Sequence, residues 1–195
     1  MAVSPVELLT IALHENYRVI EAIRPDQLDN PTPCASWNVR DLLDHLLTDL
    51  SDFGLLASFG DPAKIPVPKL GGDWLDQFRR GSDPLIDCWR QAGDLTGTMT
   101  LPGIGEVPQS FPINQQIAEF AVHTWDLAIA TGQPTDFDDE VSRTALACIE
   151  GMLRPEFRGT EAEGKAFGPQ QPVSETATER ERLAAFVGRS IPAPG

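Results

Sequence analysis

The chain has 195 residues, of which 41% are hydrophobic and 23% charged, and its formal net charge is -14 at pH 7. This composition is that of a folded globular protein and argues against intrinsic disorder. The negative charge, the pI near 4.5 and the lack of any Lys/Arg cluster argue against nucleic acid as a partner. The length predicts one domain over residues 1–195, with a core at about 4–153 and a C-terminal extension at about 154–195.

The N-terminus has no basic stretch before its apolar residues, and no run approaches the roughly 18 apolar residues of a membrane-spanning helix. The three cysteines, Cys34, Cys88 and Cys148, are widely spaced and form no CxxC motif. This pattern indicates neither a disulfide framework nor a thiolate zinc site. We therefore expect a cytoplasmic protein with reduced thiols and no contact with a membrane. The scarcity of Lys beside frequent Arg, Ala, Gly and Pro hints at a bacterium with G+C-rich codons.

Capping residues and apolar periodicity predict the first two helices. Over residues 4–23, Ser4 and Glu7 are placed for a capping box, and apolar residues then recur at intervals of three and four. Pro25 follows the end of this helix. The second helix begins after Asn38 as its N-cap, with an acidic residue three positions later, and carries a strongly apolar stripe.

Further helices are predicted at about 73–95, 113–131, 138–153 and 178–187. Before the helix at 113–131, β-branched residues flank Pro102 and Gly103, which favours a short hairpin or an ordered loop. Gly132 provides a C-terminal stop for that helix. Four long amphipathic helices predict an all-α fold, namely a four-helix bundle with extra C-terminal helices packed outside it.

Glu119 and His123 stand four residues apart on the predicted helix at 113–131, so both side chains point to the same side. A carboxylate and an imidazole supply two ligands for a divalent metal, whereas a catalytic zinc site needs about three and an open position. His45 lies beside the apolar stripe of the second helix and is the candidate third ligand, because bundles assemble metal sites from facing helices.

Other interpretations remain open at this stage. Asp126 is placed to orient a ligand or to replace Glu119, and His14 is a weaker alternative ligand. A Glu and a His four apart also occur on helices without a metal, and a lone His near an apolar stripe is more often a hydrogen-bonded core residue.

Cys34 precedes a helix N-terminus that would lower a thiol pKa, but a free cysteine is more often a small buried hydrophobic residue. Trp125 is expected in the core or in a pocket wall.

The order of the motifs adds a family resemblance. The segment LDNPTPCASWNVRDLLDHL precedes EVPQSF and AEFAVHTWDLAIATGQP, and AFGPQQPV and ERLAAFVGR follow. This pattern covers nearly the whole chain and resembles the actinobacterial branch of the DinB-like superfamily, more narrowly the metal-binding proteins related to the N-terminal domain of mycothiol-dependent maleylpyruvate isomerase. The resemblance implies an up-down-down-up bundle with a divalent metal, zinc or nickel, held by His45, Glu119 and His123.

The resemblance also implies a metal-dependent thiol S-transferase that uses a low-molecular-weight thiol such as mycothiol and a small-molecule electrophile. Homodimers are frequent among such bundles. The tail after Leu153 is shorter and richer in loops than the second domain of the isomerase, so we do not expect isomerase activity, and no catalytic residue is assigned. The alternative function is a non-catalytic bundle that binds a metal or small ligand for stability or sensing. A third interpretation makes the histidines core residues.

Overall fold

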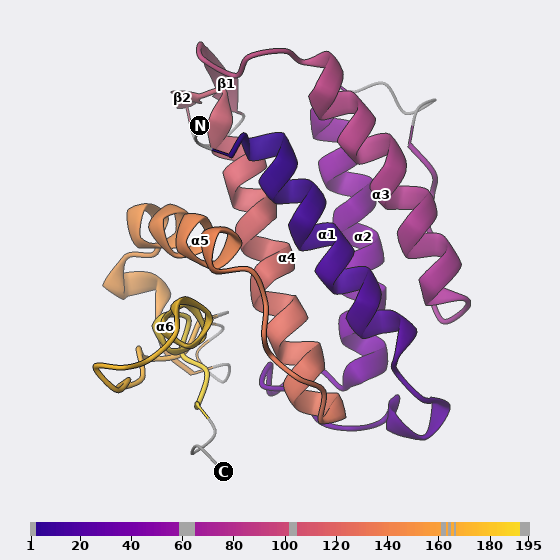
Figure 1. Cartoon of the computed structure of the whole chain (residues 1–195), viewed down its shortest axis with the longest axis vertical. Coiled ribbons are helices and arrows are strands. Elements are labelled where there is room, and N and C mark those ends of the chain that lie inside the picture. The colour runs from indigo at the N-terminus through magenta and orange to yellow at the C-terminus, as the bar shows by residue number, and fades with distance from the viewer. Residues whose placement is uncertain are drawn as a thin grey trace.

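Most of the chain folds into helices (Figure 1). A computed structural model describes residues 3–58, 65–101, 105–160, 163, 165 and 167–191. The elements are α1 (Pro5–Glu21), the 3₁₀ helix η1 (Pro25–Gln27), α2 (Val39–Ala57), α3 (Trp74–Gln91), β1 (Thr98–Leu101), β2 (Gly105–Pro108), α4 (Ser110–Thr131), α5 (Asp139–Met152), the 3₁₀ helix η3 (Pro155–Phe157) and α6 (Glu179–Phe186). The all-α prediction is confirmed: within the described ranges the sole sheet is the antiparallel β1–β2 hairpin. Pro102 and Gly103, predicted near its turn, lie outside the described residues.

The first two helices begin where their caps predict. The Ser4 hydroxyl accepts a hydrogen bond from the Glu7 backbone N–H at 3.2 Å, and the Glu7 carboxylate accepts one from the Ser4 N–H at 2.9 Å. Asn38 and Asp41 form the same reciprocal pair at the start of α2. Each pair satisfies two backbone donors that the first helical turn leaves free, which fixes the start of the helix.

Helix α4 begins at Ser110, three residues before the predicted start at residue 113. Pro112 therefore falls within the first turn, where its missing N–H removes no helical hydrogen bond. The helix ends at Gly132, as predicted, and this residue adopts the left-handed conformation with φ 68°.

Helices α1 and α4 lie side by side and run in the same direction (Figure 1). The Asn16 amide on α1 donates to the Phe120 carbonyl at 3.1 Å and to the Thr124 hydroxyl at 2.8 Å on α4. Near the ends of both helices, the Gln133 amide donates to the Val19 carbonyl at 3.0 Å. These contacts follow the same order along both helices, which shows that α1 and α4 are parallel.

Helices α2 and α3 form the second parallel pair, antiparallel to the first (Figure 1). Trp74 at the start of α3 donates its indole N–H to Asp44 near the start of α2 at 2.7 Å. Trp89 near the end of α3 donates to Gln116 near the start of α4, also at 2.7 Å. The four helices therefore follow the up-down-down-up order that the resemblance implies.

Helix α4 is buried along most of its length, because the bundle covers one side while α5 and α6 cover the other (Figure 1). An amphipathic helix has one apolar stripe, whereas a helix enclosed in this way is apolar on nearly every face. This position makes α4 the structural centre of the molecule. No helix among the described residues is both long and apolar enough to span a membrane.

Candidate metal centre

The three predicted metal ligands lie together between α2 and α4. Glu119 Oε1 is 3.0 Å from His45 Nε2 and 2.9 Å from His123 Nε2, and the three potential donor atoms lie within 4.8 Å of one another. Ligand atoms bound at about 2.0–2.1 Å to a tetrahedral zinc ion lie roughly 3.3 Å apart. A slight separation of these side chains therefore lets one divalent ion contact all three, and the donor set fits such an ion.

The local fold explains why the histidines face this point. On α2, His45 adjoins the buried Leu42 and Leu46, so the core contacts of these leucines set the direction of the imidazole. Trp37, in the loop before α2, packs on the His45 ring with a centroid separation of 4.4 Å. The loop is itself closed by the Thr32 backbone N–H, which donates to the Trp37 carbonyl at 3.2 Å. These contacts restrict the movement of His45 before any ion binds.

Glu119 remains ionised between the two histidines. Burial would raise the pKa of this carboxyl, but the charge on His123 and the hydrogen bonds from His123 and His45 outweigh it. The pKa of Glu119 therefore lies well below its usual range. An ionised carboxylate is the form that binds a divalent cation.

Asp49 is a fourth potential ligand that the sequence analysis did not single out. Its Oδ2 lies 3.3 Å from His45 Nε2, one helical turn further along α2. Burial and the charge of the neighbouring Glu119 raise the pKa of Asp49 to about 8. Two carboxylates this close favour retaining a proton between them, and a divalent cation would let both ionise. The i, i+4 spacing of His45 and Asp49 is the sequence signal that could have identified this residue.

His123 is held at both ring nitrogens. Its Nε2 faces Glu119, and its Nδ1 lies 3.0 Å from Asp126 Oδ2. Burial alone would lower the pKa of His123, but the charge of Glu119 and the hydrogen bond with Asp126 raise it well above its usual value. When Nδ1–H donates to Asp126, the lone pair for a metal is on Nε2. The geometry thus matches the orienting role that the sequence suggests for Asp126.

Asp126 is fixed in turn by Arg189, which lies just beyond α6. Arg189 Nε is 3.0 Å from Asp126 Oδ1, and Arg189 Nη2 is 3.0 Å from Oδ2. Burial would raise the pKa of Asp126, but the hydrogen bond from His123 and the charge of Arg189 lower it. Arg189 was not predicted, because nothing local in the sequence indicates a contact between residues 63 positions apart.

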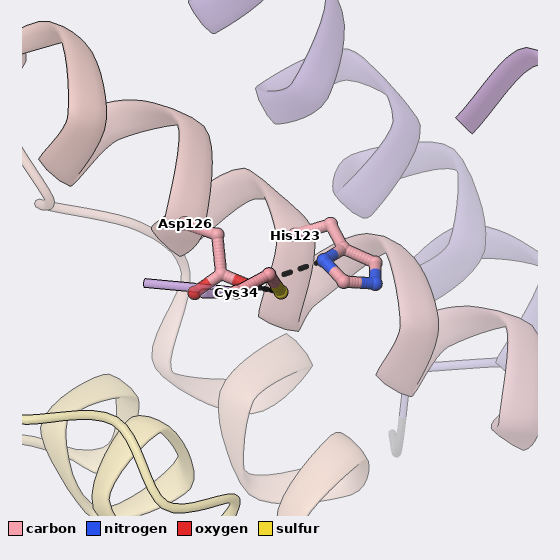
Figure 2. A group of neighbouring side chains, drawn as sticks. All are labelled: Cys34, His123 and Asp126. Atoms are coloured by element: carbon pink, nitrogen blue, oxygen red, sulfur yellow. Dashed lines mark hydrogen bonds and ion pairs between the residues drawn. The ribbon is translucent and has the colours of Figure 1, made fainter. Parts of the chain in front are cut away.

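Figure 2 shows Cys34 beside Asp126 and His123. The Cys34 thiol donates to Asp126 Oδ2 at 3.2 Å and accepts a hydrogen bond from Arg189 Nη2 at 2.8 Å. Burial raises the pKa of Cys34, which opposes the reactive thiolate considered above. Cys34, His123 and Asp126 form a second group with metal-binding donors. The Arg189 cation on Asp126 disfavours a second cation there, so the first group is the candidate metal centre.

Two further candidates are placed by the structure. His14 is exposed on α1 and belongs to neither group of donors found among the described residues. Trp125 is buried, as expected for a core or pocket-wall residue.

A cavity of about 440 Å³ opens against the ligand group. His45, Glu119 and His123 line it together with Trp37, Cys34 and Arg189. Its apolar side comes largely from the end of α5 and the segment that follows. The volume lies within the range of about 300–1,000 Å³ that small-molecule sites occupy.

The fold and site together define an all-α bundle with a His–Glu–His cluster beside a small-molecule cavity. The chain belongs to the family of the mycothiol maleylpyruvate isomerase N-terminal domain, whose family model matches residues 9–128, and the predicted family is thereby confirmed. The match includes His45, Glu119 and His123, whereas Arg189 and the apolar side of the cavity lie beyond it.

The chain is also similar to two proteins from Mycobacterium tuberculosis. These are uncharacterized protein MT0763 of strain CDC 1551 / Oshkosh and uncharacterized protein Rv0738 of strain ATCC 25618 / H37Rv. Each is 32% identical over 169 residues, which covers 87% of this chain and 88% of the relative. No solved structure is significantly similar to the chain.

Proposed function

We propose that the protein is a divalent-metal-dependent thiol S-transferase that joins a low-molecular-weight thiol such as mycothiol to a small electrophile. The observation that carries the proposal is the convergence of His45, Glu119 and His123 on one point beside the cavity. The family description, which links the matched domain to mycothiol, supports the choice of thiol. The donor set of two imidazoles and a carboxylate is compatible with zinc and with nickel.

The residues of the site would have separate roles in binding the metal ion and in orienting its ligands. His45, Glu119 and His123 would hold the ion, Asp126 would keep His123 in the tautomer with a free Nε2, and the cavity would exclude bulk water from the bound reactants. A divalent ion with an open position supplies Lewis acidity, which favours the thiolate form of a bound thiol.

The experiment begins with elemental analysis of protein purified without an affinity tag. We expect about one zinc or nickel ion per chain. His45→Ala and His123→Ala should each lose the metal, while His14→Ala, which removes the exposed histidine on α1, should retain it. Circular dichroism of each variant checks that the bundle is folded.

Activity is measured as consumption of mycothiol in the presence of 1-chloro-2,4-dinitrobenzene. Removing the metal with a chelator should reduce the rate to background, and adding it back should restore the rate. Metal-free protein that retains the full rate would rule out the proposal. Wild-type protein that purifies without metal and binds none when titrated would also rule it out.

Asp49 favours a second function, a metal-binding bundle without catalysis. Its carboxylate lies 3.3 Å from His45 Nε2, so a movement of this side chain towards a bound ion would make it a fourth protein ligand. Four protein ligands close a tetrahedral site, whereas catalytic sites keep one position open. In that case the metal would stabilise the bundle or serve sensing, and thiol consumption would stay at background even when the protein is fully loaded.

Asp49→Asn distinguishes the two functions. For an open site, this variant should bind cobalt with nearly unchanged affinity and an unchanged visible absorption spectrum. For a closed site, the loss of a ligand should weaken binding and shift the cobalt spectrum towards a different coordination. Asp52→Asn, one turn further along α2, is the matched control for the loss of a carboxylate.

A further inference from the structure

The cavity beside the metal centre has one side that is almost entirely apolar. We call this side the apolar wall, and it consists of Ile149, Met152, Leu153, Phe157 and Phe167. These residues come from the end of α5, from η3 and from the segment before α6. All of them lie beyond residues 9–128, so the family match does not account for them.

The apolar wall is held by backbone contacts. Phe157 lies in η3, and its neighbour Arg158 forms a parallel bridge with Phe167, where the Gly159 N–H donates to the Phe167 carbonyl at 2.9 Å. Arg158 also donates through Nη1 to the carbonyl of Gly168 at 3.1 Å. The two aromatic residues are therefore brought to the same side of the cavity by one bridged pair of segments.

Phe157 is 51% exposed although it is aromatic and lines the cavity. Ile149, another residue of the apolar wall, is buried in the core. An exposed aromatic ring at the mouth of an apolar pocket gains free energy when a ligand covers it, through the burial of apolar surface.

The charges around the cavity disfavour an anionic ligand on this side. Arg189 is the one Lys or Arg among the described lining residues, and it is 7% exposed. Asp126 binds it through both carboxylate oxygens, which neutralises its charge. A carboxylate or sulfonate placed against the apolar wall would therefore be desolvated, and Arg189, already paired with Asp126, is not free to compensate for this cost.

We propose that the apolar wall is a subsite for an uncharged aromatic or branched-alkyl group of a small molecule. This inference rests on the proposed function for one detail, that the group belongs to the electrophile of the transfer reaction. The polar end of the same molecule faces His45, Glu119 and His123 across the cavity. The subsite selects neutral, apolar electrophiles over dicarboxylates.

The test uses two fluorescent dyes that share a ring system and is made on metal-free protein, because a bound metal ion would itself attract an anionic dye. N-phenyl-1-naphthylamine is neutral, and 8-anilino-1-naphthalenesulfonate adds one negative charge. We expect the neutral dye to bind with one-to-one stoichiometry and at least about tenfold more tightly than the sulfonate, because the anion is desolvated without a partner.

Phe157→Ala should weaken binding of the neutral dye about fivefold, as expected for the loss of roughly 40 Å² of apolar contact. Met152→Glu, which places a charge in the apolar wall, should weaken it further. Leu70→Ala is the matched control, because Leu70 is 53% exposed but lies outside this cavity.

Equal affinity for the two dyes, or affinity for the neutral dye that neither Phe157→Ala nor Met152→Glu changes, would overturn the inference. Neither result would affect the proposed function, which depends on metal content and thiol consumption. Conversely, protein that binds no metal but shows the expected dye affinities would rule out the function and leave the subsite in place.

Discussion

Asp126 joins the candidate metal centre to the C-terminal part of the chain through a single carboxylate. It accepts from His123 on one side and from Arg189 on the other, and it is fully buried. Asp126→Asn should lower zinc affinity by about 10- to 100-fold, because the orientation of His123 is lost. It should also lower the free energy of unfolding by about 3–5 kcal/mol, because Arg189 remains buried without a counter-charge. Chelator competition and urea denaturation measure the two effects.

A double variant separates these two effects. Asp126→Asn combined with Arg189→Met removes both charges, so stability should recover in large part, since a buried ion pair can be replaced by apolar groups at little cost. Zinc affinity should remain low, because His123 still lacks its carboxylate partner. If the double variant binds zinc as tightly as the wild type, Asp126 does not orient His123.

The residues of the site differ in how far the sequence could predict them. Glu119 and His123 share one helix, so their convergence follows from helical geometry alone. His45 required the additional assumption that α2 faces α4, which the structure shows. Arg189 depends on a contact between distant segments, and its burial against Asp126 is decided by packing that no local pattern records.

At the scale of elements, the end of α6 determines where Arg189 lies. The Gly188 N–H donates to the Ala185 carbonyl at 3.0 Å, and the Arg189 N–H donates to the Ala184 carbonyl at 2.9 Å. This is the Schellman arrangement, which reverses the chain direction after a helix through a residue in the left-handed conformation. Gly188 has φ 91°, and a Cβ added there would lie 2.7 Å from Gly168 Cα.

Gly188→Ala should therefore destabilise the segment that carries Arg189. The left-handed conformation costs about 1–2 kcal/mol for a residue with a Cβ, and the contact with Gly168 adds to this cost. Hydrogen exchange of the α6 amides should accelerate, and zinc affinity should fall as Arg189 moves. Gly151→Ala is the matched control, because Gly151 lies in α5 with open space around it and the change should be neutral or stabilising by up to about 1 kcal/mol. Equal effects of the two substitutions would contradict this role of Gly188.

The helix boundaries that the sequence predicted best are those marked by capping residues close together in the chain. Ser4 with Glu7 and Asn38 with Asp41 fix the starts of α1 and α2 through contacts within four residues. Helix α4 begins three residues before the predicted start, and its first turn accepts Pro112. The 3₁₀ helices were not predicted, since three residues carry too little periodicity.

At the scale of the whole molecule, the proposed metal would connect two helices of opposite direction. His45 lies on α2, whereas Glu119 and His123 lie on α4, so an ion bound to all three opposes their separation. At free zinc 100-fold above the dissociation constant, the gain in stability is about 2.7 kcal/mol, or roughly 5–10 °C in melting temperature for a chain of this size. Calorimetry with zinc and then with excess chelator measures it.

His45→Ala provides the control for this stabilisation, because the remaining two ligands lie on one helix and cannot connect α2 to α4. Its melting temperature should be nearly insensitive to zinc. A zinc-dependent rise of the same size in this variant would show that the ion binds elsewhere.

The overall helix order could be predicted from the sequence, because the sequence has four amphipathic patterns and a family resemblance. The enclosure of α4 could not be predicted, since it depends on how α5 and α6 pack against the bundle. The single domain, the cytoplasmic location and the homodimer remain predictions.

The long separation between Asp126 and Arg189 has a consequence for the order of events during translation. At about 5–20 residues per second, the ribosome needs roughly 3–13 s to add the 63 residues that follow Asp126 up to Arg189. A nascent bundle of α1 to α4 formed in that interval already holds His45, Glu119 and His123, but its Asp126 carboxylate has no guanidinium partner. Full metal affinity would thus develop only late in synthesis, which delays tight metal capture until the later helices have been made.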